Sequence, residues 1–147
     1  MKSRLLHDGT EKTFAVIFDK GDEVASGLLD FAKARSLKAS HFTAIGAFQR
    51  TTLGFFEREK KDYKRIEINE QVEVLSLVGD IALKEDGQPQ VHAHCVVGSR
   101  DGHASGGHLL EGYVWPTLEV IVVESPGYLR RKFDEESGLA LIDPCSD

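Results

Sequence analysis

Residues 14–18 read FAVIF, and residues 23–35 follow them as EVASGLLDFAKAR. The first run is short, fully apolar and rich in β-forming residues, which is typical of a buried strand. The second predicts one amphipathic helix of about three to four turns, capped by Asp19 or by Gly21-Asp22. Its apolar stripe consists of Val24, Leu28, Phe31 and Ala32. A strand and a helix therefore come first, and the helix needs an apolar surface to cover.

From Ser40 onward the pattern changes to strands with little interruption. Strands are predicted at residues 41–48, 51–57, 63–68, 72–83, 91–97 and 117–124. The first two form either a hairpin or a bend in one long ribbon. One helix followed by a run of strands predicts an α+β fold, a two-layer domain with a mainly antiparallel β-sheet and one principal helix. A cyclic homo-oligomer is a natural way to cover the sheet face that the helix leaves free.

Three histidines stand out within this run of strands. Residues 91–97 read VHAHCVV, and a Gly-Gly-His sequence ends at His108 after a short turn. In a strand, side chains alternate between faces, so His92 and His94 point the same way. The Asp-Gly pair within residues 99–102 is typical of a hairpin turn, so we expect His108 to return antiparallel beside them.

Three imidazoles with an open fourth position suit zinc, or nickel or another divalent ion, bound with water or a small ligand. A His-x-His pair alone is common in exposed strands, and glycines before a histidine also serve ordinary bulges and hairpin ends. The third histidine behind two glycines is what favours a metal site. We therefore predict that His92, His94 and His108 bind one divalent metal ion, with zinc as the first choice.

Composition restricts the class of protein. The 147 residues suffice for one core, so we expect a single domain over residues 1–147. The chain is 41% hydrophobic and 29% charged, and no apolar run approaches the roughly 20 residues that cross a bilayer. We expect no membrane partner. The first residues lack the pattern of a secretory signal, which makes the cytoplasm the expected location.

Charge argues against nucleic acid as the partner. The formal net charge is −6, whereas binding to duplex DNA draws most of its nonspecific affinity from Lys and Arg. The densest basic groups, at residues 58–64 and 130–132, are interleaved with or followed by acidic residues. Both are expected to be solvated loops.

Other candidate residues are weaker. Cys95 is expected to be a buried thiol and Cys145 to lie in a mobile end without assigned chemistry. His103 fits a surface loop, with a further ligand or a proton shuttle as the alternative. A carboxylate often orients a metal-binding imidazole, and the residues available for this role are Glu119, Glu57, Asp101 and Glu111. His7 and His41 have no spaced partner and are expected to be structural or exposed.

The ordered combination of these elements resembles a known family. A helix is followed by AIGA at residues 44–47, LGFF at 53–56, EVLSLVG at 73–79, His-x-His, and GGHL at 106–109. This order resembles the PPC domain family, also called DUF296, the plants and prokaryotes conserved domain. The similarity covers about residues 14–124, and it lies in the combination, since no single element suffices.

The resemblance implies an α+β fold with a mainly antiparallel sheet and assembly as a homotrimer. It also implies metal binding by the histidines of His-x-His and Gly-Gly-His, here His92, His94 and His108. Plant members carry an AT-hook and bind DNA, whereas prokaryotic members are usually the lone domain. This chain has no Arg-Gly-Arg-Pro core and is acidic, so we do not carry the plant role over.

Three functions remain as hypotheses. The first is an enzyme of hydrolysis or hydration, or a small-molecule sensor, built on the bound metal. The chain has no His-Glu-x-x-His motif and no phosphate-binding glycine loop, so the sequence assigns neither catalytic residues nor a substrate. The second is a non-enzymatic regulator that binds DNA or another protein. The third is a structural metal that ties two strands together.

Overall fold

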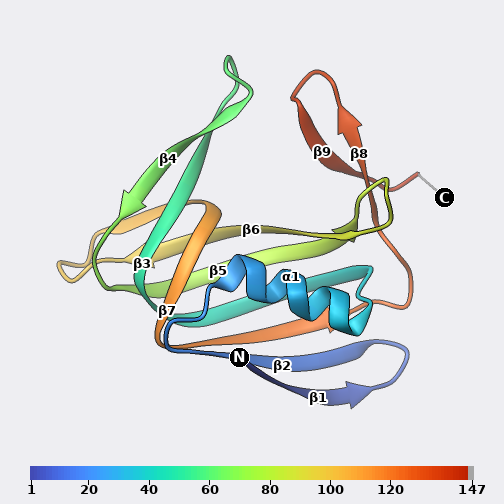
Figure 1. Ribbon diagram of the computed structural model, residues 1–147, viewed down its shortest axis with the longest axis horizontal. Coiled ribbons are helices and arrows are strands. Elements are labelled where there is room, and N and C mark those ends of the chain that lie inside the picture. The colour runs from blue at the N-terminus through green and yellow to red at the C-terminus, as the bar shows by residue number, and fades with distance from the viewer. Residues whose placement is uncertain (146–147) are drawn as a thin grey trace.

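The computed structural model describes residues 1–145, and these contain one helix and nine strands (Figure 1). The elements are β1 (Lys2–Asp8), β2 (Lys12–Asp19), α1 (Val24–Arg35), β3 (Ala39–Glu57), β4 (Asp62–Ile68), β5 (Val72–Leu83), β6 (Pro89–Gly98), β7 (Ala104–Glu124), β8 (Arg130–Asp134) and β9 (Leu139–Asp143). The α+β class with one helix is confirmed. The helix of 12 residues is too short to cross a membrane, and no other helix occurs in the described part of the chain.

Helix α1 buries the predicted stripe, since its buried residues are Val24, Leu28, Phe31 and Ala32. The prediction of its cap was wrong. Glu23 caps the helix, and its carboxylate accepts hydrogen bonds from the backbone N–H groups of Ala25 and Ser26. Asp22 instead accepts a hydrogen bond from the backbone of Asp19 in the preceding turn. A glutamate takes the capping position because its longer side chain also reaches the Gly112 N–H on β7.

The sheet closes on itself around the core. β3 pairs with β5 and β7, and β6 also pairs with both, so these four strands form a circuit of hydrogen-bonded neighbours. Their pairings are antiparallel, whereas β5 and β8 pair in parallel at Leu83 and Arg130, which makes the sheet mixed. α1 covers one side of this structure (Figure 1). Buried aromatic and aliphatic side chains between them, including Phe18, Phe42 and Leu118, form the core.

Two strands are longer than the sequence suggested. Residues 41–48 and 51–57 belong to the continuous β3, so the bent ribbon is the alternative that holds. Residues 117–124 are the last part of β7, which also carries His108. Shifts in register between β3 and β7 near Phe48 let both strands bend and remain paired. Because of this bend, β3 and β7 contribute residues to the core at one end and lie beside His108 at the other.

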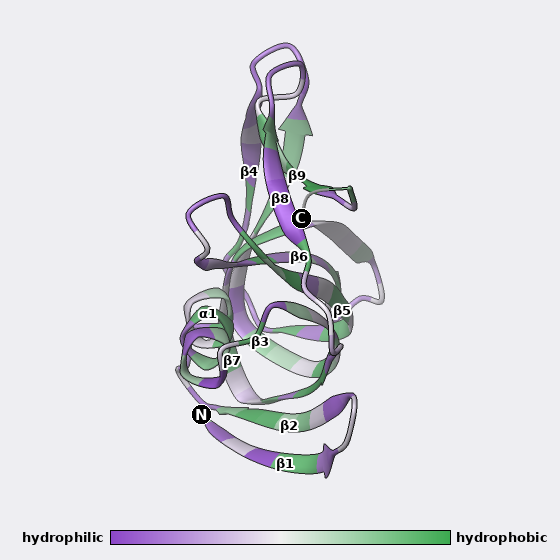
Figure 2. Cartoon of the chain, turned by 90° about the vertical axis from the view of Figure 1, so that its right-hand side faces the viewer, coloured by the Kyte–Doolittle hydropathy of each residue, from purple (hydrophilic) through white to green (hydrophobic). Residues whose placement is uncertain are grey.

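Two arms project from the same side of the body (Figure 2). The β3–β4 arm comprises residues 51–68, and the C-terminal hairpin comprises β8 and β9. The expectation that residues 130–132 form a solvated loop was wrong, because they belong to β8 and the Arg131 side chain is only 5% exposed. The Lys61 ammonium donates a hydrogen bond to the Glu135 carbonyl at 2.6 Å and joins the tips of the arms.

Candidate metal centre

Strand β6 alternates between the core and an open face. Ala93 and Cys95 are buried, as expected of the inward positions. His92 and His94 occupy the outward positions, where His92 is partly exposed and His94 exposed. Cys95 is 1% exposed, and burial raises the pKa of its thiol to about 12, which confirms it as a core residue. The alternation of the strand therefore presents two imidazoles side by side.

β7 brings the third histidine to the same place. After the turn at residues 99–102, β7 runs antiparallel to β6, and His108 lies directly opposite His94. The close approach of β7 to β3 requires a glycine at position 107, because a Cβ there would lie 2.7 Å from the Gly54 carbonyl oxygen on β3. Any larger residue would push β7 away from β3 and displace His108. The hairpin predicted from the sequence is confirmed.

The three imidazoles converge. One ring nitrogen from each of His92, His94 and His108 lies within 4.8 Å of the others. The ring of His92 is nearly parallel to that of His108 at 5.2 Å, and the His94 ring stands almost perpendicular to both. A tetrahedral zinc ion about 2.0–2.1 Å from each nitrogen fits among three donors spaced this closely after small side-chain rotations.

The electrostatics of this cluster favour the neutral forms of His94 and His108. Burial, and then the nearby His92 and His94, lower the pKa of His108 from 6.5 to about 4. Burial and His92 also lower the pKa of His94. A neutral imidazole is the form that binds a metal ion. In addition, Nδ1 of His108 is buried without a hydrogen-bond partner among the described residues, as expected of a donor set that fits a cation.

Asp80 stands next to His92 on the neighbouring strand, and sequence reasoning missed it. The two residues are direct partners between β5 and β6, and Asp80 Oδ2 lies 3.4 Å from His92 Nδ1. The other carboxylate oxygen accepts a hydrogen bond from Arg131. Burial alone would raise the pKa of Asp80, but His92 and Arg131 together hold it below its ordinary value. Asp80 is therefore a carboxylate positioned to orient a metal-binding imidazole.

Tyr63 forms another side of the site and was also missed. Its ring stacks on His108 with centroids 4.6 Å apart and 22° between the planes, and the ring of Phe56, its partner on β3, makes an edge contact with it. Tyr63 belongs to the β3–β4 arm, so this arm fixes the orientation of His108. No local pattern in the sequence links the two residues, because β4 reaches β7 only through its pairing with β3.

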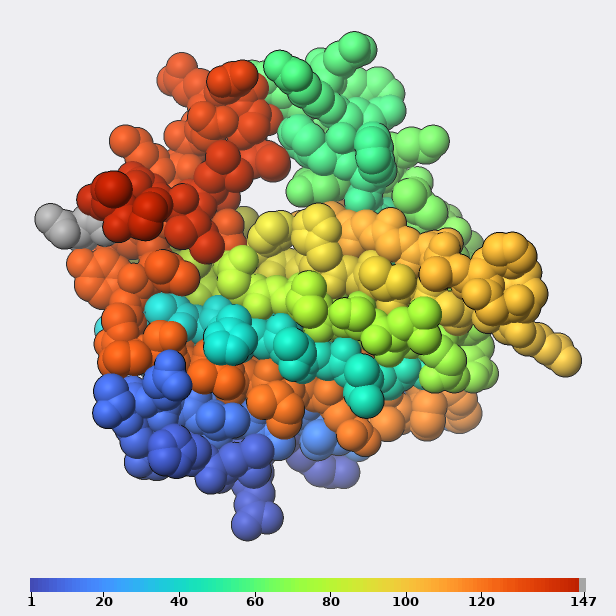
Figure 3. Space-filling view, turned by 180° about the vertical axis from the view of Figure 1, so that it is seen from behind, coloured from blue at the N-terminus to red at the C-terminus, as the bar shows by residue number. Residues whose placement is uncertain are grey.

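The arms frame an opening above the histidine strand. Figure 3 shows a gap between the β3–β4 arm (green) and the C-terminal hairpin (red), with β6 (yellow) along its lower edge. The hydrogen bond between Lys61 and Glu135 closes the frame at the top.

The remaining candidates lie elsewhere. His103 is 85% exposed in the turn and pairs with Asp101 at 2.8 Å, which fits the expected surface loop. Of the two interpretations open for Glu119, a histidine-orienting carboxylate or a charged strand residue that faces solvent, the second holds, because Glu119 is exposed on β7. Glu119 lies at the far end of β7 from His108, between Ile17 and Ile45. The other carboxylates pair with basic residues, Glu57 with Lys60 and Glu111 with Arg65. His7 and His41 are exposed on β1 and β3.

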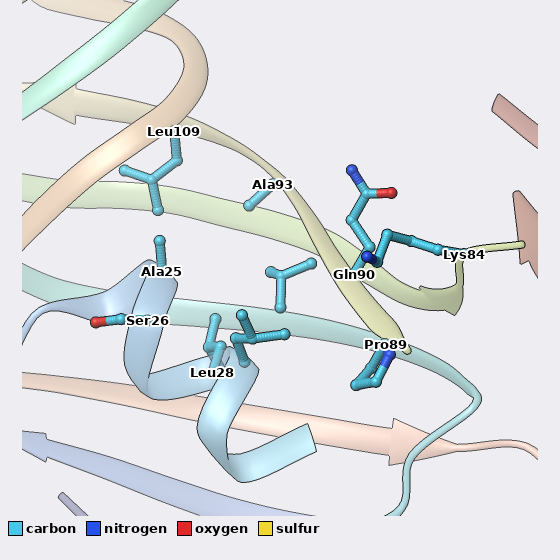
Figure 4. A pocket seen from close by; sticks show the side chains of 10 residues that line it. Ala25, Ser26, Leu28, Lys84, Pro89, Gln90, Ala93 and Leu109 are labelled. Atoms are coloured by element: carbon cyan, nitrogen blue, oxygen red, sulfur yellow. The ribbon is translucent and has the colours of Figure 1, made fainter. Parts of the chain in front are cut away.

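A separate pocket lies on the inner side of β6. It measures about 350 Å³ and is bounded by apolar side chains of α1 and β6, including Leu28 and Ala93, together with Leu109 of β7 (Figure 4). Ala93 points into it, and the neighbouring His92 and His94 point to the opposite face of the strand. The pocket is therefore distinct from the histidine cluster.

Comparison with known proteins connects this geometry to other structures. The sequence model of the Plants and Prokaryotes Conserved (PCC) domain matches residues 7–126. No curated protein matches the chain. A metal-containing protein from Archaeoglobus fulgidus is 35% identical, with a TM-score of 0.81, and the alignment covers 89% of this chain and 92% of that one.

Two further solved structures are similar. A plant- and prokaryote-conserved protein from Pyrococcus horikoshii is 32% identical with a TM-score of 0.85, over 99% of this chain and 96% of that one. A protein from Ralstonia eutropha, named a candidate DNA-binding protein, is 29% identical with a TM-score of 0.82, over 88% of this chain and 90% of that one. The resemblance noted in the sequence is confirmed.

Proposed function

The chain belongs to the Plants and Prokaryotes Conserved (PCC) domain family, and from this premise we propose that it is a metal-binding domain that acts on or senses a small molecule. His92, His94 and His108 hold one divalent ion. The observation that carries the proposal is the convergence of one nitrogen from each ring within 4.8 Å. The printed name of the relative from A. fulgidus, a metal-containing protein, supports it.

The donor set favours zinc, with nickel or another transition ion as the alternative. A zinc ion bound by three histidines supplies a Lewis acid and a water molecule of lowered pKa, which suits hydrolysis or hydration. The residues of the chain supply the rest. Asp80 holds His92 in place, the Tyr63 ring holds His108, and exposed His94 leaves the cluster accessible from solvent.

The choice between enzyme and sensor depends on a general base. Within residues 1–145, the carboxylate that contacts the cluster is Asp80, and it is already engaged by His92 and Arg131. A residue in that position orients a ligand and has little freedom to accept a proton from substrate. The structure therefore supports a bound small molecule, coordinated in the open position, more directly than a particular reaction.

Calorimetric titration with Zn²⁺ tests the proposal. We expect the native protein to bind roughly one ion per chain and His94→Ala to lose this binding. His103→Ala is the matched control, because it removes an exposed histidine from the turn beside the site. Equal binding by the native protein and His94→Ala, or loss of binding in His103→Ala, would refute the assignment of ligands.

We further propose a homotrimer that covers the sheet face opposite α1. The exposed large apolar side chains of β3, β5 and β7 include Ile45, Leu75, Val78 and Ile121, which line one shared surface. Patches of this kind commonly mark protein contacts. Val78 lies opposite His94, so the apolar face adjoins the metal site. In the proposed assembly each chain is a mainly antiparallel two-layer unit, with α1 on one face of the sheet and a neighbouring copy on the other.

Light scattering coupled to gel filtration tests the assembly. Native protein should run as a trimer, and Ile45→Glu should run as a smaller species, since burial of a charge opposes association. Leu6→Glu is the control, because it adds the same charge at an exposed apolar position of β1. A native monomer would refute the proposal.

A regulator that binds DNA or protein is the second proposal, and the printed name of the R. eutropha relative favours it. The net charge of −6 favours a protein over DNA as the partner. Fluorescence anisotropy with labelled duplex DNA at about 50 mM salt, where electrostatic contacts are strongest, tests the DNA version. Absence of binding under these conditions would rule DNA out.

A further inference from the structure

Arg131 is buried within a hairpin whose apolar side chains are exposed. It is 5% exposed, whereas Phe133, Leu141 and Ile142 of the same hairpin are 58%, 45% and 37% exposed. An isolated two-stranded hairpin has marginal stability, and a buried guanidinium is costly unless it is paired. Among the residues of β8 and β9, the one that is buried is therefore the charged Arg131.

Two successive contacts connect the buried guanidinium to the histidine cluster, the first from Arg131 to Asp80 and the second from Asp80 to His92. One terminal nitrogen of Arg131 donates to Asp80, and the other donates to the Ala140 carbonyl oxygen at 3.2 Å across the hairpin. Asp80 in turn faces His92 Nδ1 at 3.4 Å. The planar guanidinium thus fixes the hairpin and the carboxylate at the same time, a role that its fork of donors suits.

The hairpin is held to β5, to the turn that follows β5 and to the β3–β4 arm at several further points. At its base, the Leu83 N–H donates to the Leu129 carbonyl at 2.7 Å, and along β8 the Phe133 N–H donates to the Glu85 carboxylate at 3.1 Å. At its tip, Lys61 donates to the Glu135 carbonyl. The match to the family ends at residue 126, before the hairpin begins. The hairpin therefore reaches Asp80 from outside the region that the family model matches.

We propose that the C-terminal hairpin is a working part of the metal centre, in which Arg131 holds Asp80 and Asp80 orients His92 for metal binding. The inference rests on the proposed metal site. A carboxylate at Nδ1 accepts a hydrogen bond from the Nδ1–H group, which keeps the proton on that nitrogen and leaves the Nε2 lone pair for the ion. Without Arg131, Asp80 would lose the contact that fixes its carboxylate, and His92 would rotate more freely.

Zinc affinities measured by competition with a chelator test this chain of contacts. Loss of a carboxylate behind a histidine ligand weakens metal binding by about 10- to 100-fold, and we expect Asp80→Asn to fall in this range. Arg131→Met keeps a long, unbranched side chain but removes the charge, and it should also weaken zinc binding. The double variant should bind no more weakly than Asp80→Asn, because Arg131 acts only through Asp80.

Two control variants separate positioning from stability. Lys132→Met removes the same charge from the exposed neighbouring position, and Leu118→Ala lowers stability in the core at a residue outside the site. Both should keep the native zinc affinity. Should Arg131→Met fail to fold, Arg131→Lys replaces it, since a single ammonium cannot reproduce both guanidinium contacts and should give a smaller loss of affinity.

Three outcomes would overturn the inference. Native affinity in folded Arg131→Met or Arg131→Lys would show that the hairpin does not serve the site. Additive losses in the double variant would show that Arg131 acts by another route. Absence of zinc binding in the native protein would refute the proposed function and the inference with it. In the first two outcomes the native protein still binds zinc, so only the role of the hairpin is refuted.

Discussion

Replacing His108 with glutamine should remove part of the acid sensitivity of the metal-free protein. The pKa of His108 is lowered to about 4 in the folded protein, first by burial and then by His92 and His94, from an ordinary 6.5. The unfolded chain therefore binds a proton at His108 between about pH 6.5 and 4 that the folded chain does not. The free energy of unfolding should fall as pH falls through this window, and level off below it.

The size of the effect follows from the same values. A difference of about 2.5 pKa units, at about 1.36 kcal/mol each, gives an upper value of about 3.4 kcal/mol. Solvent at the partly exposed ring screens some of this, so we expect about 2 to 3 kcal/mol. The titratable groups that face His108 are His92, His94 and Tyr63, and they remain in the variant.

Urea unfolding in the presence of EDTA at pH 7 and pH 4 measures this difference. The fall in the free energy of unfolding should be smaller in His108→Gln than in the native protein by that amount. His103→Gln should keep the native pH dependence, because that histidine is exposed in the turn. An unchanged pH dependence in His108→Gln would refute the account of a buried neutral imidazole.

Three further predictions concern packing and the thiols. Gly107→Ala should lower the free energy of unfolding by about 1–3 kcal/mol and weaken zinc binding, because its Cβ would meet the Gly54 carbonyl oxygen; native values in urea unfolding and zinc titration would contradict this. Leu118→Ala should cost about 2–5 kcal/mol in urea unfolding while zinc stoichiometry stays native, and a loss below 1 kcal/mol would show that this core position tolerates a cavity. A thiol reagent should modify exposed Cys145 rapidly and Cys95 only on unfolding, since burial raises the pKa of Cys95 to about 12; rapid modification of both cysteines would contradict its burial.

The histidine cluster could be predicted from the sequence because its geometry is local. Strand alternation places His92 and His94 on one face, and a short turn returns His108 beside them. The whole arrangement is therefore encoded in one short, continuous stretch of sequence. The stripe of α1 was predictable for the same reason. The cap was not, because Glu23 gains its second partner, Gly112, from a distant strand.

The residues around the cluster could not be predicted because they arrive through long-range pairings. Asp80 lies beside His92 only once β5 pairs with β6, and Tyr63 meets His108 through β4 and β3. Arg131 comes from a segment whose mixed charges are typical of a loop. Glu119 does not reach the histidines because β7 is long, and its far end belongs to the apolar face.

Elemental analysis of protein purified without a polyhistidine tag tests the central claim most directly. The native chain should carry roughly one divalent ion per subunit, and the variant with alanine at His92, His94 and His108 should carry none. Equal metal content in the two proteins, or no metal in the native chain after incubation with zinc or nickel, would contradict the assignment of these histidines as a metal centre.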